Sequence, residues 1–429
     1  MKKKAISQAV ALIVGCLALA TIIGCGGGGG GGATGPTAPS ITTASLPSGA
    51  RTEPYSKVLT ASGGMPPYAW SATGLPTGIT LSAAGALTGT PSVEGTFAPV
   101  FTVTDSATMQ AQTPLDLRIA KPLALFVADF STPSGAVDMF DNASVADGVS
   151  AWTRQLQGAL TTLDNDVGGP PAGVSYDAAR NILYVARFQG SDNGAVLAFH
   201  NADSVDENTA PNRIIQAIVP TSFSLHSPSD VFIDSGNDRI YIADVTGSSG
   251  SIFILDNASV APTLRKGFSF PPGPPPAAIS VDVGRDILYV VPSQGQEIIA
   301  YDNISELPVA PRTITIGSTA GVGLVDVKID PATDTAYAAD YDGGRVFVID
   351  NVSQKDGTWA PDRALTGLTN PNSVFPDVAN DRLFVSNRDG ATSYSVRVVE
   401  EMSSVNGPVS FSRELSGFGT AAGMTGYYK

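Results

Sequence analysis

Short apolar runs separated by turn residues recur along almost the whole chain. Runs such as "ALFVADF", "ILYVARF" and "RIYIADV" are rich in Val, Ile, Tyr and Phe, and Gly, Pro, Asp or Asn flank them. This pattern is typical of β-strands joined by tight turns. Beyond residue 40, no segment shows the 3.6-residue period of a long amphipathic helix. The fold class predicted from the pattern is all-β.

A unit of about fifty residues repeats through residues 121–429. Its clearest part reads "GAVDMFDNAS", "GAVLAFHNAD", "GSIFILDNAS", "QEIIAYDNIS" and "GRVFVIDNVS", with five asparagines in register: Asn142, Asn201, Asn257, Asn303 and Asn351. One strand precedes each of these runs, a further strand ending in aspartate precedes most of them, and an arginine-led strand follows. Four strands per unit, repeated six times, predict a six-bladed β-propeller.

The first unit lacks its innermost strand, whereas the last residues, "AAGMTGYYK", form a strand without a unit of their own. Pairing this C-terminal strand into the first blade would close the ring and remove an exposed sheet edge. The propeller is therefore predicted to be closed by the C-terminal strand.

The fifth unit, "VDVKIDPATDTAYAADYDGGRVFVID", resembles NHL-type propeller repeats. The resemblance extends over all six units, but the longer period of the first units and the "DN" ending depart from that family. It implies membership in the broader group of six-bladed propellers.

Residues 39–120 carry six or seven shorter strand patterns, which predict a small β-sandwich. The motifs "GGMPPYAW", "GLPTGITL" and "GALTGTP" resemble those of the Ig-like domains, cadherin-like in fold, that recur in bacterial surface proteins. The resemblance implies that Trp70 lies in the core and that Gly89, Thr90 and Pro91 form a tight turn. A domain of this kind usually acts as a spacer.

The N-terminus has the pattern of an export signal. Lys2, Lys3 and Lys4 precede an apolar run that ends in "IIGC", which resembles the lipobox of bacterial lipoproteins. The resemblance implies cleavage before Cys25 and lipidation of its thiol, so that residues 1–25 are the signal peptide. The glycine-rich residues 26–38 would then be a flexible tether. The predicted location is the bacterial cell envelope, as an outer-membrane lipoprotein facing either the periplasm or the cell surface.

Composition and charge restrict the possible partners and chemistry. The net charge of −14 becomes −17 once the three signal lysines are removed, and such an acidic surface excludes nucleic acid. Both cysteines lie in the N-terminal segment, so the body has no disulfide, and two histidines are too few for a three-histidine metal centre. The expected partners are the membrane, through the lipid anchor, and an unidentified protein or small-molecule ligand.

A repeated aspartate ends five of the predicted inner strands: Asp177, Asp234, Asp282, Asp330 and Asp377. Because a residue that recurs in nearly every blade is better explained by the fold than by catalysis, these carboxylates are interpreted as caps of loop amides. The same holds for Asp129, Asp244 and Asp340, which Arg187, Pro292 and Asn387 replace in other blades. The "Asn-x-Ser" triplets are interpreted as turns.

Residues that break the repeat are the better candidates for function. The loops joining second to third strands and fourth to first strands share one rim, which is the candidate ligand-binding site: Asp164, Asp166, Arg187, Asp192, His226, Tyr341 and Asp342. The segment "DNDVG" is a truncated calcium-loop pattern, so calcium stays open as a cofactor and no other is expected.

The favoured hypothesis is a non-enzymatic, lipid-anchored binding or scaffold protein, whose sandwich holds the propeller away from the membrane. The alternative is a calcium-dependent, lactonase-like or other hydrolase acting in the propeller channel. A structural envelope component without a ligand is a third hypothesis.

Overall fold

A computed structural model describes residues 37–428, apart from residues 131–134, 147–151, 164–168, 190–193, 219–222, 247–248, 272, 307–309, 318–320 and 391–393. Cys25, Asp164, Asp166 and Asp192 lie outside the described residues. Within these residues no helix has the length and apolar character needed to cross a bilayer. The described residues include three short 3₁₀ turns between strands: η1 (Ala159–Thr161), η2 (Val352–Gln354) and η3 (Val378–Asn380).

The first domain is a sandwich of short strands arranged in four small sheets, β1-β4, β10-β9-β5, β2-β11-β8 and β3-β7-β6. Its strands are β1 (Ser40–Ile41), β2 (Gly49–Ala50), β3 (Tyr55–Val58), β4 (Ala61–Ser62), β5 (Ala69–Thr73), β6 (Ile79–Leu81), β7 (Ala86–Gly89), β8 (Gly95–Phe97), β9 (Val100–Thr104), β10 (Gln110–Pro114) and β11 (Leu117–Ala120). Trp70 is buried in its core with Leu87 and Phe101, as predicted.

Gly89 corrects one sequence-based expectation. It ends β7 and pairs with both Tyr55 and Ile79, so it belongs to a strand and not to a tight turn with Thr90 and Pro91. A Cβ atom at this position would lie 2.0 Å from the carbonyl oxygen of Gly78. Glycine is therefore required by the close approach of two strands.

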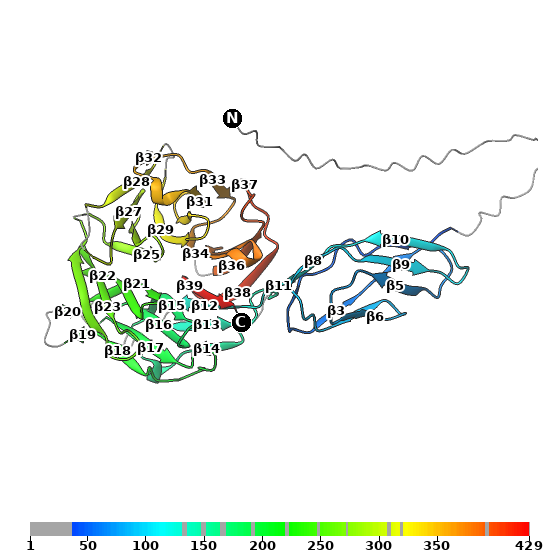
Figure 1. Ribbon diagram of the computed structural model, residues 1–429, viewed down its shortest axis with the longest axis horizontal. Helices are drawn as coiled ribbons and strands as arrows, with labels where there is room; N and C mark the ends of the chain where they lie inside the picture. The colour runs from blue at the N-terminus through cyan, green and yellow to red at the C-terminus, as the bar shows by residue number, and fades with distance from the viewer. Residues whose placement is uncertain are drawn as a thin grey trace, which may run out of the picture.

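The second domain consists of six sheets arranged as a ring around a common centre (Figure 1). Each sheet is one blade, and its strands are given from inner to outer. Blades 1 to 3 consist of β39 (Ala421–Tyr428), β12 (Leu123–Asp129), β13 (Ala136–Phe140) and β14 (Arg154–Leu156); β15 (Pro171–Asp177), β16 (Ile182–Arg187), β17 (Ala195–His200) and β18 (Arg213–Ile215); and β21 (Ser227–Asp234), β22 (Arg239–Thr246), β23 (Ser249–Asp256) and β24 (Thr263–Ser269). Blades 4 to 6 consist of β25 (Pro276–Asp282), β26 (Ile287–Pro292), β27 (Glu297–Asp302) and β28 (Arg312–Ile316); β29 (Leu324–Asp330), β30 (Thr335–Asp340), β31 (Arg345–Asp350) and β33 (Arg363–Thr366); and β34 (Pro371–Asp377), β35 (Arg382–Arg388), β36 (Tyr394–Glu400) and β38 (Arg413–Phe418).

The C-terminal strand closes the ring. β39 pairs antiparallel with β12, from Tyr428 opposite Leu123 to Ala421 opposite Asp129. This confirms the predicted closure, because the first unit of the sequence has no inner strand of its own. One apolar cluster fills each of the six seams between neighbouring blades, including the seam between blades 6 and 1, where Leu125, Phe384 and Met424 meet.

Arginines at or near the start of the outer strands hold neighbouring blades together. In every blade this guanidinium donates to a backbone carbonyl of the next blade; the donors are Arg154, Arg213, Arg265, Arg312, Arg363 and Arg413. Arg413 of blade 6 reaches the carbonyl oxygens of Ala143 and Ala146 in blade 1, at 3.0 and 2.9 Å. The arginine-led strand of the repeat is therefore an inter-blade link.

Loops of one blade also extend the outer edge of the preceding blade. β32 (Gly357–Trp359) pairs parallel with β28, and β37 (Gly407–Pro408) pairs parallel with β33. A separate short hairpin, β19 (Ala217–Ile218) and β20 (Phe223–Ser224), lies between blades 2 and 3 in the chain. The added strands occupy backbone groups that would otherwise form an exposed edge.

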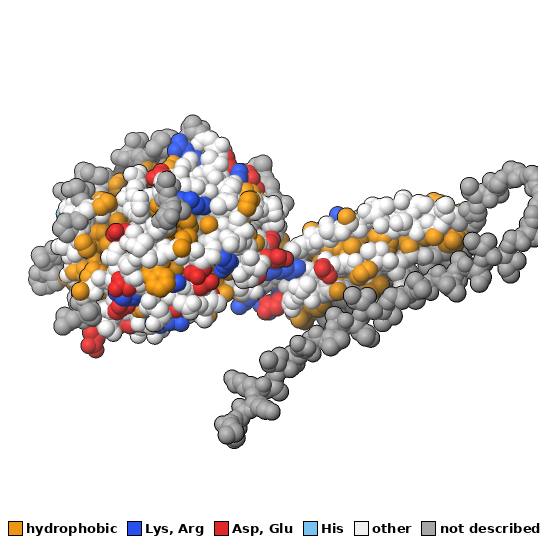
Figure 2. Space-filling view, turned by 90° about the horizontal axis from the view of Figure 1, so that it is seen from above, with side chains coloured by type: hydrophobic (Ala, Val, Ile, Leu, Met, Phe, Trp, Pro, Cys, Tyr) orange, Lys and Arg blue, Asp and Glu red, His pale blue; other side chains and the backbone are white. Residues whose placement is uncertain are grey.

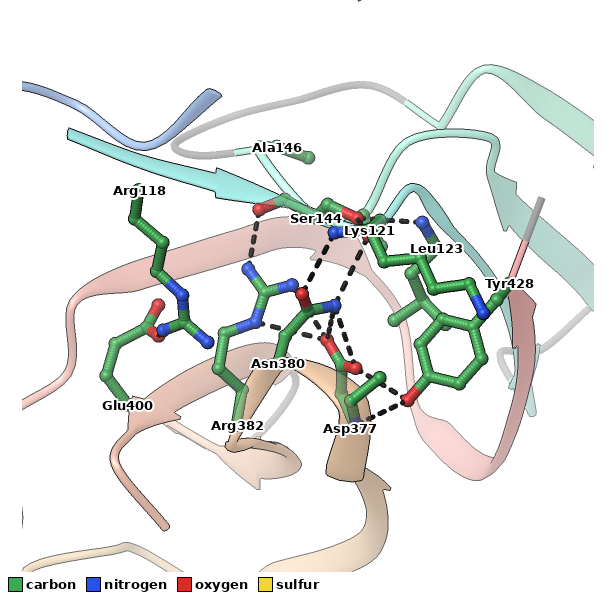
Figure 3. A network of polar contacts seen from close by, with 12 residues as sticks. Arg118, Lys121, Leu123, Ser144, Ala146, Asp377, Asn380, Arg382, Glu400 and Tyr428 are labelled. Carbon is green, nitrogen blue, oxygen red and sulfur yellow. Dashed lines mark hydrogen bonds and ion pairs between the residues drawn. The ribbon is translucent and has the colours of Figure 1, made fainter. Parts of the chain in front are cut away.

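The sandwich meets the propeller at blade 6 through polar contacts. Arg118 of β11 lies 2.9 Å from Glu400, and the backbone N–H of Lys121 donates to the side chain of Asn380. Figure 2 shows charged side chains gathered where the two domains join. Figure 3 shows that this junction continues into a network around Asp377, whose carboxylate accepts from Arg382, Asn380 and the Tyr428 hydroxyl of the closing strand.

Candidate functional site: the central channel

The six inner strands enclose a cavity of about 200 Å³ at the centre of the propeller. Each inner strand contributes to its wall, which consists of Val174, Ser175, Val231, Phe232, Ser280, Lys328, Ile329, Asp330, Pro331, Phe375, Pro376, Val378, Met424 and Thr425. Asp330 ends the inner strand β29, and Pro331 and Val378 belong to the hairpins between first and second strands. The cavity therefore lies at the hairpin end of the channel, on the side where the sandwich joins.

A partly buried lysine joins two buried aspartates in the channel. The Nζ atom of Lys328 lies 3.2 Å from Oδ1 of Asp326 and 3.5 Å from Oδ2 of Asp230. Asp230 is on the inner strand of blade 3, while Lys328 and Asp326 are on that of blade 5, so the contact bypasses blade 4. Lys328 thus links two blades that are not neighbours.

The charges of this triad are mutually dependent. Burial alone would lower the pKa of Lys328, but the charges of Asp230 and Asp326 outweigh burial and raise it. Burial raises the pKa of Asp230 in spite of the neighbouring ammonium. The negative charge of Asp326 adds to the effect of burial on the pKa of Asp230.

The oxygens of the two aspartates also bind backbone groups. The Asp230 carboxylate accepts the N–H of Val231 and, from the next blade, the N–H of Ile279. The Asp326 carboxylate accepts the N–H of Val327. It also accepts the N–H of Val374 and the hydroxyl of Ser373 in blade 6. Both carboxylates therefore tie their inner strand to the following one.

Two serines make the same kind of link in the other blades. The hydroxyl oxygen of Ser175 accepts the N–H of Ile233 at 3.0 Å, and that of Ser280 accepts the N–H of Ile329 at 3.1 Å. The inner strands of blades 2 to 6 are thus connected in sequence by alternating serine and aspartate side chains. These contacts stabilise the channel wall.

The sequence interpretation overlooked Asp230, Asp326 and Lys328, although the repeat contains a signal for them. Four residues before the terminal aspartate of the inner strand, the blades carry Gly173, Asp230, Ala278, Asp326 and Ser373. Two residues before it they carry Ser175, Phe232, Ser280, Lys328 and Phe375. Comparing the residues at these two positions from blade to blade would have identified the channel residues, because Asp230, Asp326 and Lys328 differ there from their counterparts in other blades.

The repeated aspartates act as caps, as interpreted from their recurrence. Asp177, Asp234, Asp282 and Asp330 each accept an N–H group of the hairpin that follows. The aspartates of the second strands, Asp129, Asp244 and Asp340, accept N–H groups where the chain enters an inner strand. Asp377 differs, because it binds side chains at the domain junction instead of hairpin amides.

The "DN" ending of the repeat is a turn, as interpreted. Asn201, Asn257, Asn303 and Asn351 have positive φ angles between 53° and 58°. After Asn257, Asn303 and Asn351, the serine two residues further on donates to an aspartate of the same blade's hairpin, as Ser259 does to Asp238 and Ser305 to Asp286. Both the asparagine and the serine therefore have structural roles.

The described residues of the rim named in the sequence lie at the opposite end of the channel. Buried Arg187 donates to the Thr162 hydroxyl at 3.0 Å, and burial lowers the pKa of Arg187. Nδ1 of His226 lies 3.3 Å from buried Asp244. The Tyr341 hydroxyl accepts from Arg388 at 2.8 Å, and the Asp342 carboxylate packs against the backbone of Gly323. The role of this rim stays a prediction.

Comparison with known proteins assigns the first domain. Residues 37–120 match the model of the family described as putative Ig domain. This segment matches the Ig-like family proposed from its motifs. No curated protein matches the chain.

Several solved structures are similar to the larger part of the chain. A chain of a nidogen–laminin complex is 13% identical, with a TM-score of 0.48, and the match covers 71% of this chain and 98% of that one. A putative 6-phosphogluconolactonase from Bacteroides uniformis is 14% identical, with a TM-score of 0.46 and coverage of 69% and 83%. A protein of unknown function from Bacteroides caccae is 10% identical, with a TM-score of 0.48 and coverage of 72% and 100%.

Proposed function

We propose that this chain is an exported, lipid-anchored, non-enzymatic binding protein of the bacterial cell envelope, in which the Ig-like domain holds the propeller away from the membrane. The observation that carries the non-enzymatic part is the pairing of Lys328 with Asp230 and Asp326 in the channel. The two channel carboxylates bind the protein's own ammonium and its own backbone. They act as structural groups, and the apolar cavity beside them supports a binding role.

The calcium-dependent, lactonase-like alternative requires a channel calcium ion, and the residues present do not fit one. Calcium takes six to eight oxygen ligands, whereas the channel places an ammonium between two carboxylates whose oxygens already accept backbone N–H groups. Among the described residues there is no group of three or more His, Cys, Asp or Glu side chains suited to hold a metal. Kinship with NHL-type repeats stays a prediction.

Calcium titration of the purified full chain tests the non-enzymatic part. Isothermal calorimetry should detect no stoichiometric calcium, and the melting temperature should be the same in calcium and in EDTA. One calcium ion per chain, lost in the variant Asp326→Asn but kept in Asp342→Asn, would contradict the proposal and favour a channel hydrolase.

Metabolic labelling with a fatty acid tests the anchor, and the chain supplies its own control. The apolar segment contains Cys16 as well as Cys25; Cys25 follows "IIG", and Cys16 follows "IVG", a second and weaker lipobox-like match. When the full gene is expressed in a bacterium, Cys25→Ser should abolish the label and Cys16→Ser should retain it. Equal labelling of both variants would exclude Cys25 as the lipidated residue.

A further inference from the structure

Five inner strands place a ring of residues at one level of the channel. Counting two residues back from the terminal aspartate of each inner strand, blades 2 to 6 contribute Ser175, Phe232, Ser280, Lys328 and Phe375. All five line the cavity of about 200 Å³. The level therefore combines two phenyl rings with three groups that carry hydrogen-bond donors.

The polar groups at this level still have hydrogen-bond donors to offer, and each of their oxygens already accepts at least one N–H group. The oxygens of Ser175 and Ser280 accept N–H groups from the neighbouring strands, so their own protons are what they offer to the cavity. Lys328 has three N–H groups and two carboxylate partners. The oxygens of Asp230 and Asp326 accept backbone groups. These unused donors favour a molecule that accepts hydrogen bonds in the cavity.

The charge of the channel residues and the size of the cavity further restrict the class of ligand. Two buried carboxylates already face one ammonium, so a third anion would be repelled, which favours a neutral acceptor such as a carbonyl oxygen. Val174, Val231, Ile329 and Met424 complete an apolar wall around the phenyl rings. An apolar cavity of about 150 Å³ admits a benzene-sized molecule, so this one has room for a ring with a short substituent.

We propose that the cavity at the hairpin end of the channel, the channel mouth, binds a small neutral molecule with a planar apolar body and a carbonyl oxygen. Lys328, Ser175 and Ser280 hold this molecule between Phe232 and Phe375. This inference rests on the proposed binding function and specifies its ligand class. It is independent of lipidation and of calcium, so its failure would leave the anchor and the non-enzymatic assignment unaffected.

Three matched fragments test the ligand class on the purified full chain by saturation-transfer NMR and calorimetry. Benzamide supplies the ring and a neutral carbonyl, benzoate supplies the ring and an anion, and toluene supplies the ring without an acceptor. Benzamide should bind, and benzoate and toluene should each bind at least about tenfold more weakly. No binding of benzamide, or equal binding of benzoate, would overturn the proposal.

Two exposed valines locate the site without disturbing the core. Val378 and Val283 directly follow the terminal aspartates of blades 6 and 4 and are 40% and 42% exposed, but only Val378 lines the cavity. Val378→Glu should weaken benzamide binding severalfold, and Val283→Glu should not change it. Equal effects of the two variants would refute this location. Unchanged binding by folded Lys328→Met would refute the role of the ammonium.

Discussion

Asp138 is a buried carboxyl that departs from the repeat. The residues at the equivalent position of the third strand in the other blades are Leu197, Phe253, Ile299, Phe347 and Arg397. Asp138 is 0% exposed, its Oδ1 accepts from Gln155 at 2.8 Å, and its Oδ2 has no hydrogen-bond partner among the described residues. Burial raises the pKa of Asp138 to about 7, the Gln155 hydrogen bond opposes this rise, and the charge of Asp129 adds to it.

Replacing this carboxyl should change how stability depends on pH. A carboxyl whose folded pKa lies above its unfolded value stabilises the fold fully below the unfolded pKa, and this stability is lost as the pH rises through about 7. Asp138→Asn keeps the acceptor for Gln155 and removes the ionisation. Above pH 7 it should raise the free energy of unfolding by on the order of 3 kcal/mol.

Chemical denaturation at pH 5 and pH 8 measures this effect. The variant should gain stability over the natural chain mainly at the higher pH. Asp116→Asn, at an exposed position of the sandwich, serves as the control and should leave the difference between the two pH values unchanged. A gain for Asp138→Asn of equal size at both pH values would show that ionisation is not the cause.

At the scale of elements, the links between blades follow the repeat. The arginine that begins an outer strand donates to the next blade, and the serine after the "DN" turn donates to a hairpin aspartate of its own blade. These residues recur for mechanical reasons, because every blade must attach to its neighbour in the same way. Recurrence alone could suggest a structural role for them, but their partners lie in other elements and could not be read from spacing.

The arginine link at the seam between blades 6 and 1 offers a quantitative test. Arg413 is largely buried and donates to two carbonyl oxygens of blade 1. Arg413→Gln should lower the free energy of unfolding by about 2 kcal/mol, since hydrogen bonds to charged groups are lost while the acceptors stay in place. Denaturant unfolding measures this loss.

Arg51→Gln is a suitable control for the same measurement. Arg51 lies 3.7 Å from Glu94 at a partly exposed position of the sandwich, where a single ion pair contributes little. If the two arginine variants lost equal stability, Arg413 would not be a specific link of the ring.

For the molecule as a whole, ring closure and domain attachment share one region. The closing strand β39 brings Tyr428 to Asp377, and Asp377 binds Asn380, which in turn contacts Lys121 at the start of the propeller (Figure 3). η3 contains both Asn380 and Val378, so one short turn borders the domain junction and the channel mouth. The sandwich is thus attached beside the proposed binding site.

Disturbing the closing strand should destabilise the whole propeller. A Cβ at Gly423 would lie 2.8 Å from the carbonyl oxygen of Ala172, so Gly423→Val should force β39 away from its neighbours. Deleting residues 421–428 removes the strand and with it buried Met424. The deletion should lower the melting temperature by at least about 10 °C and Gly423→Val by less.

Thermal melting followed by circular dichroism measures both effects. Gly321→Asn is the control glycine, because no atom lies within 4 Å of its Cβ position and asparagine tolerates its positive φ of 69°. An unchanged melting temperature after deletion of β39 would contradict the closed ring.

Sequence alone was sufficient for the architecture of this protein, because strand and turn preferences act locally and a repeat multiplies their signal. The blade count, the closing strand, the buried Trp70 and the capping aspartates all follow from patterns within a unit or between units. The channel triad needed the tertiary structure, since Asp230 and Lys328 are almost a hundred residues apart and meet only when the ring closes. Gly89 was misassigned for the same reason: the strand that approaches it comes from another part of the sandwich. Departures from a repeat show that a position is special, but only their arrangement in space decides what they do together.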